Sequence, residues 1–159
     1  MKLLELRWPV VVVGVVLALA LAGLVEAVII PEVEPLTLGY WKTHSSYGPA
    51  ERDNTWDGVQ PDAEASDFFD TGESWIDVLW TPPRSNAFYI LAHQYIAARL
   101  NVLNGAVTPG DVADAITHAG ELLDAYDGDP NPMTDITGVV RENFVETAET
   151  LDEWNNSGE

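Results

Sequence analysis

Four closely spaced side chains have the chemistry to bind a ligand: Tyr40, Trp41, Lys42 and His44. Lys42 is the only lysine after the first 27 residues, and His44 is one of three histidines. In a chain that otherwise avoids lysine, we expect Lys42 to have a specific partner. In a structural role that partner is a carboxylate or the ring of Trp41 or Trp80, and in a functional role it is an anionic or sugar ligand.

A second polar group falls on a segment that predicts an apolar helix. Its members are Asn86, His93, Asn101 and Asn104, spaced by 7, 8 and 3 residues, which places them near one helix face. Polar groups on an apolar helix need hydrogen-bond partners. The stripe is therefore either a hydrogen-bonded network that holds the preceding segment or the floor of a cleft where His93 meets His44. We predict that His93 and Asn101 join Tyr40, Trp41, Lys42 and His44 in one cluster of six residues. This cluster would form either the most specific surface of the domain or its main buried polar joint.

The same residues leave an enzymatic alternative open, namely an extracellular hydrolase using a His44/His93 pair with a carboxylate such as Asp77. The sequence holds no HExxH or HxH metal motif and no Gly-x-Ser-x-Gly elbow. It has no cysteine, which excludes a thiol nucleophile and a thiolate metal site. We therefore favour a non-enzymatic role and assign no catalytic residue.

Calcium is the one cofactor that the sequence suggests. Four residues match positions 1, 3, 5 and 9 of an EF-hand loop: Asp127, Asp129, Asn131 and Asp135. Pro132 replaces the glycine of position 6, and Gly138 replaces the glutamate of position 12. A helix stop made of Asp, Gly and Pro has the same appearance, so both interpretations stand.

Three predicted helices must position these groups. The first covers about 86–103 and is apolar on nearly every side, which is typical of a central buried helix. The second covers about 108–126, with Thr108 as its cap and Pro109 as its first residue. The third covers about 134–154, with an inner apolar stripe of Ile136, Val139, Val140, Phe144, Val145, Ala148, Leu151 and Trp154. The predicted fold is mainly α, with the central helix packed by the other two.

The segment 36–83 is rich in Gly, Pro, Asp and Trp and lacks long periodic runs. We predict an irregular Trp-rich segment with short helical turns near 66–69 and 74–79, packed by its four tryptophans. Residues 36–156 would form a single domain, followed by the tail 157–159. The triplet Asn155-Asn156-Ser157 is an N-glycosylation sequon.

The N-terminal residues 1–27 have the layout of a secretory signal. Lys2 and Arg7 precede an apolar run of 16 residues, and Val25 and Ala27 suit a cleavage site before a linker at 28–35. A membrane-spanning helix needs about 20 apolar residues and a signal core about 7–15, so an uncleaved signal anchor is the alternative. In both cases we expect the domain to lie outside the cytoplasm. It would be free if the signal is cleaved, and attached to the membrane through residues 1–27 if it is not.

The formal net charge of −19 persists after removal of residues 1–27. Such a surface repels nucleic acids and anionic lipids, so neither is an expected partner. An acidic, lysine-poor surface is typical of adaptation to high salt, where screening weakens self-repulsion. A surface whose carboxylates are neutralised by bound calcium is the alternative.

Four sequence blocks carry a resemblance to a known domain: LTLGYWKTH (36–44), SYGP (46–49), VLWTPP (78–83) and NAFYILAHQYIAARLNVLNGA (86–106). They resemble an uncharacterised "GYWKxH" domain of exported and cell-surface proteins of bacteria and archaea. The late LDEWNN (151–156) is similar to its usual ending, where tyrosine is more common than Trp154. The resemblance implies an exported domain and supplies no catalytic assignment.

The predicted function is accordingly an exported or surface-tethered, non-enzymatic binding or structural domain of the cell envelope. Its expected partner is an envelope component, such as a glycan, or another protein subunit. The extracellular hydrolase and a calcium-dependent surface assembly subunit are the two alternatives.

Overall fold

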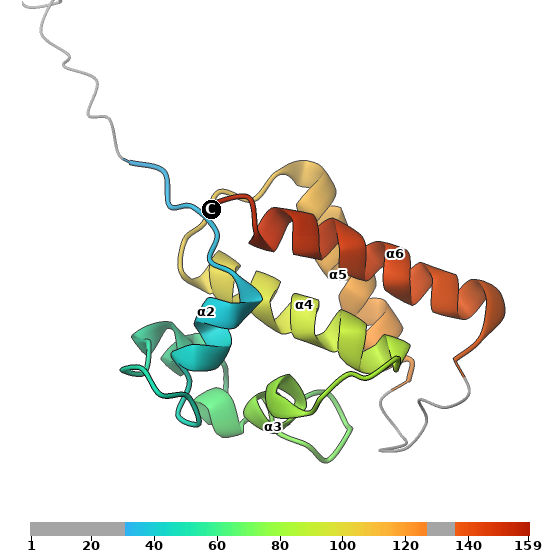
Figure 1. Ribbon diagram of the computed structural model, residues 1–159, viewed down its shortest axis with the longest axis horizontal. Helices are drawn as coiled ribbons and strands as arrows, with labels where there is room; N and C mark the ends of the chain where they lie inside the picture. Colours follow the sequence, from blue (N-terminus) through green and yellow to red (C-terminus); the bar gives the residue numbers. More distant parts are fainter. Residues whose placement is uncertain (1–30, 127–135) are drawn as a thin grey trace, which may run out of the picture. The chain divides into compact units, whose positions relative to one another are not determined.

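The computed structural model describes residues 31–126 and 136–159, most of which belong to one compact unit, Glu32–Glu159. Its elements are α2 (Leu38–Thr43), the 3-10 turns η1 (Asn54–Gly58) and η2 (Ala63–Ala65), α3 (Trp75–Trp80), α4 (Ala87–Leu103), α5 (Gly110–Asp124) and α6 (Gly138–Asn155) (Figure 1). In the described residues the only extended pairings are the isolated bridges Val33–Ala106 and Asp67–Ser74. The predicted mainly α fold is confirmed.

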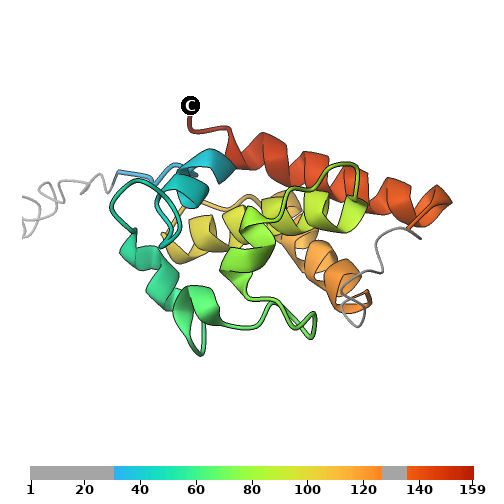
Figure 2. The same ribbon diagram turned by 60° about the horizontal axis from the view of Figure 1, so that its bottom comes forward.

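Helix α4 is the centre of the domain. Twelve of its seventeen residues are buried, and it contacts α2, α3, α5 and α6 (Figures 1 and 2). Asn86 caps it, because its side chain accepts a hydrogen bond from the Phe88 amide at 3.0 Å. A helix surrounded on this many sides has no wide polar face, which explains its nearly uniform apolar sequence.

The two helices that cover α4 begin later than predicted. Helix α5 starts at Gly110, with Pro109 in the cap position, and Thr108 donates to the Ala106 carbonyl instead of capping. Helix α6 starts at Gly138, whose positive φ of 59° suits glycine.

The predicted inner stripe of the third helix is wrong at Val139 and Val140, although its first member, Ile136, is buried. Val139 is 71% exposed and Val140 36% exposed, whereas Phe144 and Leu151 are fully buried. Figures 1 and 2 show the reason, since the first turn of α6 extends past the beginning of α4. A helical face is buried only along the length where a partner helix runs beside it.

The irregular segment packs through its tryptophans, as expected. Trp41 and Trp56 are fully buried, and Trp75 and Trp80 pack half-buried against the core. Helix α2 was not predicted. It is six residues long and begins where the Thr37 hydroxyl accepts from the Tyr40 amide. Of the two predicted turns, 74–79 corresponds to α3, whereas 66–69 is not helical.

Two groups of predictions fall outside the described residues. These are the N-terminal apolar run and the calcium candidates Asp127, Asp129 and Asn131, with Asp135. Within 31–126 and 136–159, no helix combines the length and apolar character that a membrane span requires.

Candidate functional site

Asn101 forms the main buried polar joint of the domain. Its side-chain oxygen accepts from the Trp41 indole N–H at 3.0 Å and from the Leu36 amide at 2.7 Å. Its side-chain nitrogen donates to the Leu36 carbonyl at 2.9 Å and to the Asn155 side-chain oxygen at 2.9 Å. One fully buried amide thus fixes the chain before α2 to the middle of the fold, which is the structural role predicted for the polar stripe.

Asn155 extends this joint to the end of α6. It is fully buried and its side-chain nitrogen donates to the Gln94 backbone carbonyl at 3.1 Å and side-chain oxygen at 3.0 Å. The sequon asparagine is therefore part of the packed interior. An attached glycan would have to replace these hydrogen bonds.

His93 is buried against α3 and 4% exposed. Its Nε2 lies 2.9 Å from the Val78 carbonyl, and because a carbonyl only accepts, Nε2 carries the hydrogen. Burial lowers the pKa of His93, the hydrogen bond to Val78 opposes this, and the Lys42 ammonium lowers the pKa further. The neutral imidazole is thus the form that the fold accommodates.

His44 belongs to a different cluster, at the C-cap of α2. Its ring stacks on Tyr40 with centroids 3.9 Å apart, and its Nδ1 donates to the Tyr40 carbonyl at 2.9 Å. The Tyr40 hydroxyl donates to Asp53 at 2.8 Å. Burial acts to raise the pKa of Asp53, but hydrogen bonds from Thr55 and Tyr40 outweigh it and lower that pKa. His44 and His93 therefore donate hydrogen bonds to different backbone carbonyls, those of Tyr40 and Val78.

Lys42 has one of the predicted structural partners. Its Nζ lies 5.1 Å from the centroid of the Trp80 ring, a cation–π distance. The Trp80 indole N–H donates to the Ser45 hydroxyl at 3.1 Å, and Ser45 donates to the Lys42 carbonyl at 2.8 Å. No ion pair joins Lys42 to a carboxylate in the part of the chain that is described. The Trp80 ring therefore holds the lysine in place.

Tyr47 is a surface feature that the sequence interpretation missed. It is 58% exposed, its ring centroid lies 6.4 Å from that of Trp80, and its hydroxyl donates to Asp77 at 3.2 Å. That hydrogen bond raises the pKa of Tyr47. We define the Lys42–Tyr47 face as Lys42, Tyr47 and Trp80. The sequence signal that could have identified Tyr47 is its place in the SYGP block, directly after the GYWKxH block.

Beside Tyr47 is an open hollow of about 490 Å³, here named the Tyr47 hollow. It is lined by Ser46, Tyr47, Asp62, Ala63, Glu64, Ala65, Ser74, Ile76 and Asp77. Glu64 braces one wall, because its carboxylate accepts from the Ser46 amide at 2.9 Å and pairs with Arg52 at 3.1 Å. Ser74 donates to Asp77 at 2.6 Å.

The turn that carries Tyr47 depends on Gly48. A Cβ placed on Gly48 would overlap the backbone carbonyl of Thr43, at the end of α2. Only glycine lets the chain pass so close to that helix end. The GYWKxH block and the SYGP block therefore act together to bring Tyr47 beside Trp80.

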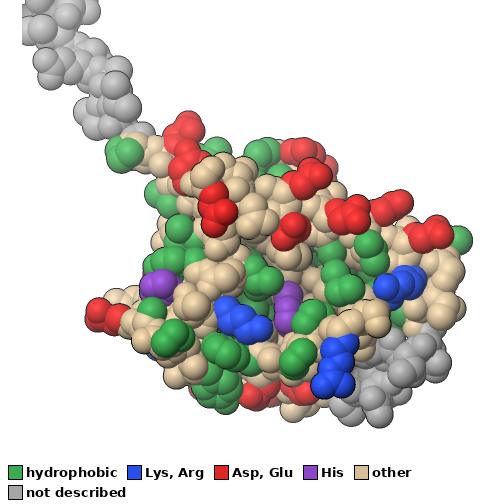
Figure 3. All heavy atoms as spheres, viewed as in Figure 1, with side chains coloured by type: hydrophobic (Ala, Val, Ile, Leu, Met, Phe, Trp, Pro, Cys, Tyr) green, Lys and Arg blue, Asp and Glu red, His purple; other side chains and the backbone are tan. Residues whose placement is uncertain are grey.

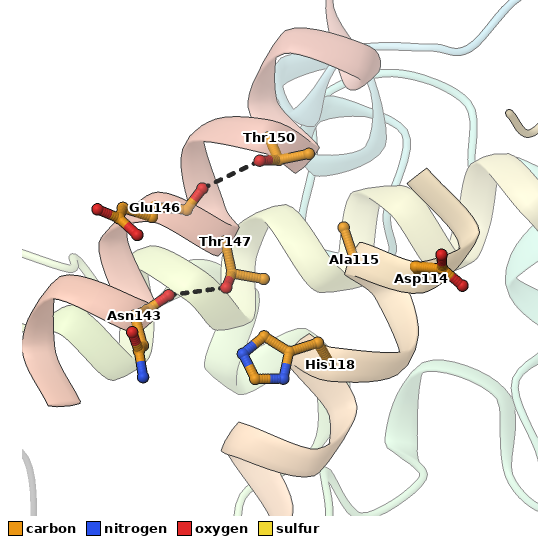
Figure 4. A pocket seen from close by; sticks show the side chains of 7 residues that line it. All are labelled: Asp114, Ala115, His118, Asn143, Glu146, Thr147 and Thr150. Atoms are coloured by element: carbon orange, nitrogen blue, oxygen red, sulfur yellow. Dashed lines mark hydrogen bonds between the residues drawn. The ribbon is translucent and has the colours of Figure 1, made fainter. Parts of the chain in front are cut away.

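A second hollow, of about 350 Å³, lies between α5 and α6. Figure 4 shows Thr147 and Thr150 turned back to their own helix, where they donate to the Asn143 and Glu146 carbonyls. His118 lines the hollow from α5, and its Nδ1 lies 3.9 Å from Glu121. None of the six predicted cluster residues lines this hollow.

The predicted six-residue cluster is thus divided rather than gathered in one cleft. Stacked and edge-to-face rings link His44, Tyr40 and Trp41, and Trp41 is bonded to Asn101. Lys42 and His93 lie outside this series of contacts, although the ammonium charge of Lys42 contributes to the lowered pKa of His93. In the described ranges, no group of three or more His, Cys, Asp or Glu residues is arranged to hold a metal ion.

Comparison of the chain with protein-family models, with curated proteins and with solved structures finds no match.

Proposed function

We propose that this chain is an exported or surface-tethered, non-enzymatic binding domain of the cell envelope, which attaches to an envelope component through the Lys42–Tyr47 face. The observation that carries the proposal is the pairing of an exposed ring with an unpaired cation. Tyr47 is the one exposed aromatic side chain among the described residues, and Lys42 lies over the neighbouring Trp80 ring.

Charge distribution supports the choice of this face. Figure 3 shows acidic side chains over α6, while on the same side of the domain Lys or Arg atoms are bordered by hydrophobic ones. Arg52, by contrast, pairs with Asp57 at 2.9 Å and with Glu64 at 3.1 Å. Among the described residues Arg84, Arg99 and Arg141 also have no ion pair, and Lys42 differs from them in lying over Trp80, the ring next to exposed Tyr47. On a chain with net charge −19, a cation beside an exposed aromatic ring is a feature that a ligand can recognise.

The histidine geometry favours binding over hydrolysis. A general base needs a ring nitrogen within reach of the substrate proton. His93 is buried and its Nε2 is hydrogen-bonded to Val78, whereas His44 stacks on Tyr40 in a separate cluster, so the two rings do not form the pair that the hydrolase would use. Asp77, the carboxylate considered for the hydrolase, accepts from Tyr47 and Ser74 instead.

Export and the resemblance to the GYWKxH domain are parts of the same proposal. The signal-like residues 1–27 support a location outside the cytoplasm. The GYWKxH and SYGP blocks contribute Lys42 and Tyr47, and the VLWTPP block contributes Trp80. The blocks that carry the resemblance are therefore those that build the proposed binding face.

The test is co-sedimentation of the purified full-length chain with the envelope fraction of the cells that produce it. We expect the wild-type chain to sediment with the envelope, and Lys42→Met and Tyr47→Ala to remain in the supernatant. Arg99→Met is the matched control, because Arg99 also lies over a ring, 6.0 Å from the Tyr95 centroid, but belongs to α4, whereas Lys42 belongs to α2.

Both outcomes are informative if circular dichroism shows that each variant is folded. Loss of sedimentation in the two variants, with Arg99→Met unchanged, supports the binding function and its face. Equal sedimentation of all four proteins, or of none, contradicts the proposal.

A further inference from the structure

The geometry points to a neutral saccharide unit as the ligand of the Tyr47 hollow. This inference rests on the binding function proposed above and identifies its ligand class. It follows from three properties of the hollow: an oriented aromatic ring, a mixed set of hydrogen-bonding groups, and a charge that repels anions.

The aromatic ring is oriented before any ligand arrives. The Tyr47 hydroxyl is tied to Asp77 at 3.2 Å, and its ring lies against Trp80 at a centroid distance of 6.4 Å. The Trp80 face is covered by Lys42 at 5.1 Å, so Tyr47 is the ring left for a ligand. Sugar rings present C–H groups with partial positive charge, which suit the negative face of an aromatic ring.

The polar groups of the hollow match hydroxyl groups better than an ammonium group. A sugar hydroxyl both donates and accepts, and the hollow offers the Asp62 carboxylate as an acceptor together with the Ser46 hydroxyl. An ammonium group only donates and needs several free acceptors. Glu64 is already engaged by Arg52 and Ser46, and both oxygens of Asp77 accept hydrogen bonds.

The charge of the hollow excludes acidic ligands. Three carboxylates line it, those of Asp62, Glu64 and Asp77, and none of its lining residues is a lysine or an arginine. Arg52 is held by Glu64 and Asp57 and is not available to an incoming anion. Phosphate, sulfate and uronate groups would therefore meet a net negative wall.

The experiment is isothermal titration calorimetry on the full-length chain in a detergent that carries no sugar headgroup. The neutral probes are maltotriose, mannotriose, galactotriose and chitotriose, the acidic probe is trigalacturonate and the amine probe is trilysine. We expect at least one neutral probe to bind, with the acidic probe and the amine probe giving no measurable heat. Heat from the acidic or amine probe alone, or from none of the probes, overturns the inference.

Variants locate the site. Tyr47→Ala should weaken binding of the neutral probe about tenfold, because the stacking surface is lost. Tyr47→Phe keeps the ring and should retain most of the affinity. Asp62→Asn tests the lining, and Asp114→Asn is its control because Asp114 lines the separate α5–α6 hollow. Unchanged affinity in Tyr47→Ala contradicts this assignment.

Failure of the inference is distinguishable from failure of the proposed function. If the neutral probe releases the chain from the envelope in the co-sedimentation assay, both stand. A second outcome is that sedimentation depends on Tyr47, no saccharide competes with it, and protease treatment of the envelope abolishes the sedimentation. In that case the binding function stands and the saccharide assignment is wrong. If the envelope does not retain the chain at all, the binding function itself is wrong.

Discussion

The indole N–H of Trp41 and the side-chain oxygen of Asn101 meet at 3.0 Å in the interior, although 60 positions separate them in the chain. Both residues are fully buried. The same oxygen accepts from the Leu36 amide, and the same amide group donates to Asn155. Asn101 therefore joins the chain before α2, helix α2 itself, helix α4 and the end of α6.

Replacement of Asn101 by alanine should be strongly destabilising. It removes one side-chain amide and leaves the Trp41 indole, the Leu36 amide and the Asn155 oxygen without this partner. Each orphaned buried group costs about 1–3 kcal/mol, so we expect a loss of at least about 2 kcal/mol in the free energy of unfolding. Urea denaturation measures it.

The control for this variant is Asn104→Ala. Asn104 is half-buried, and its side-chain oxygen accepts one long bond, 3.4 Å, from Thr55. We expect a change below about 1 kcal/mol there. Equal denaturation midpoints for Asn101→Ala and Asn104→Ala would show that the buried joint is not what stabilises the fold.

The free energy of unfolding should fall as the pH drops below about 6.5, because the folded state resists protonation of His93 while the unfolded state accepts a proton near that value. The unfolded state binds more protons in this window, so stability rises with pH there. One such group contributes at most about 1.4 kcal/mol per pH unit. Thermal melting between pH 5 and pH 7.5 measures the slope.

His93→Gln should flatten this slope, since a glutamine amide can donate to Val78 without titrating. His118→Gln is the control, because His118 is exposed and its nearest carboxylate is 3.9 Å away. If the pH dependence of stability persists in His93→Gln but disappears in His118→Gln, His118 causes it and the prediction for His93 is wrong.

Lys42→Met should raise the pKa of His93, because the ammonium charge of Lys42 lowers it. Nuclear magnetic resonance titration of the imidazole protons reads this directly. The methionine keeps an apolar stem on Trp80, so stability should fall by no more than about 1 kcal/mol, the size of an exposed cation–π interaction. Arg99→Met, which removes a cation elsewhere on α4, should leave the His93 titration unchanged.

Salt should stabilise the domain, and sodium chloride should act about as well as calcium chloride at matched ionic strength. The net charge of −19 makes self-repulsion large, and screening removes it without a specific site. Differential scanning calorimetry in the two salts makes the comparison. A calcium-specific rise of several degrees that is lost in Asp127→Asn and Asp129→Asn would instead establish the predicted calcium loop.

Asn155 should carry no glycan in the folded protein, even when the chain is produced in a host that glycosylates such triplets. Its side chain is fully buried and hydrogen-bonded to Gln94 and Asn101. Mass spectrometry of the intact chain is the measurement. A glycan mass that disappears in Ser157→Ala would contradict the buried position of this residue.

The long elements were predictable because they depend on local signals. The apolar run of 87–103 after the Asn86 cap predicts a buried central helix, and α4 spans that range. Periodicity also predicts the cores of α5 and α6, since residues three and four positions apart share a face. The same periodicity failed at Val139 and Val140, because no local signal tells where a partner helix ends.

The candidate residues themselves could be chosen from the sequence, because their types are rare in it. The single lysine after residue 27 and the three histidines stand out on composition alone. Composition does not tell which of them face one another. His44 and His93 looked like a pair, yet one stacks on Tyr40 in its own helix and the other donates to α3.

The sequence by itself determined the mainly α class, the central helix and the residues worth testing, because capping and hydrophobic periodicity act over a few neighbouring positions. Only the tertiary structure decided that Asn101 belongs to a buried joint and that Tyr47 stands exposed beside Trp80. Those outcomes depend on contacts between segments 30 to 60 positions apart, such as Tyr47 with Asp77 and Trp41 with Asn101. Which distant segments meet is set by how the whole core packs, and no local pattern encodes that.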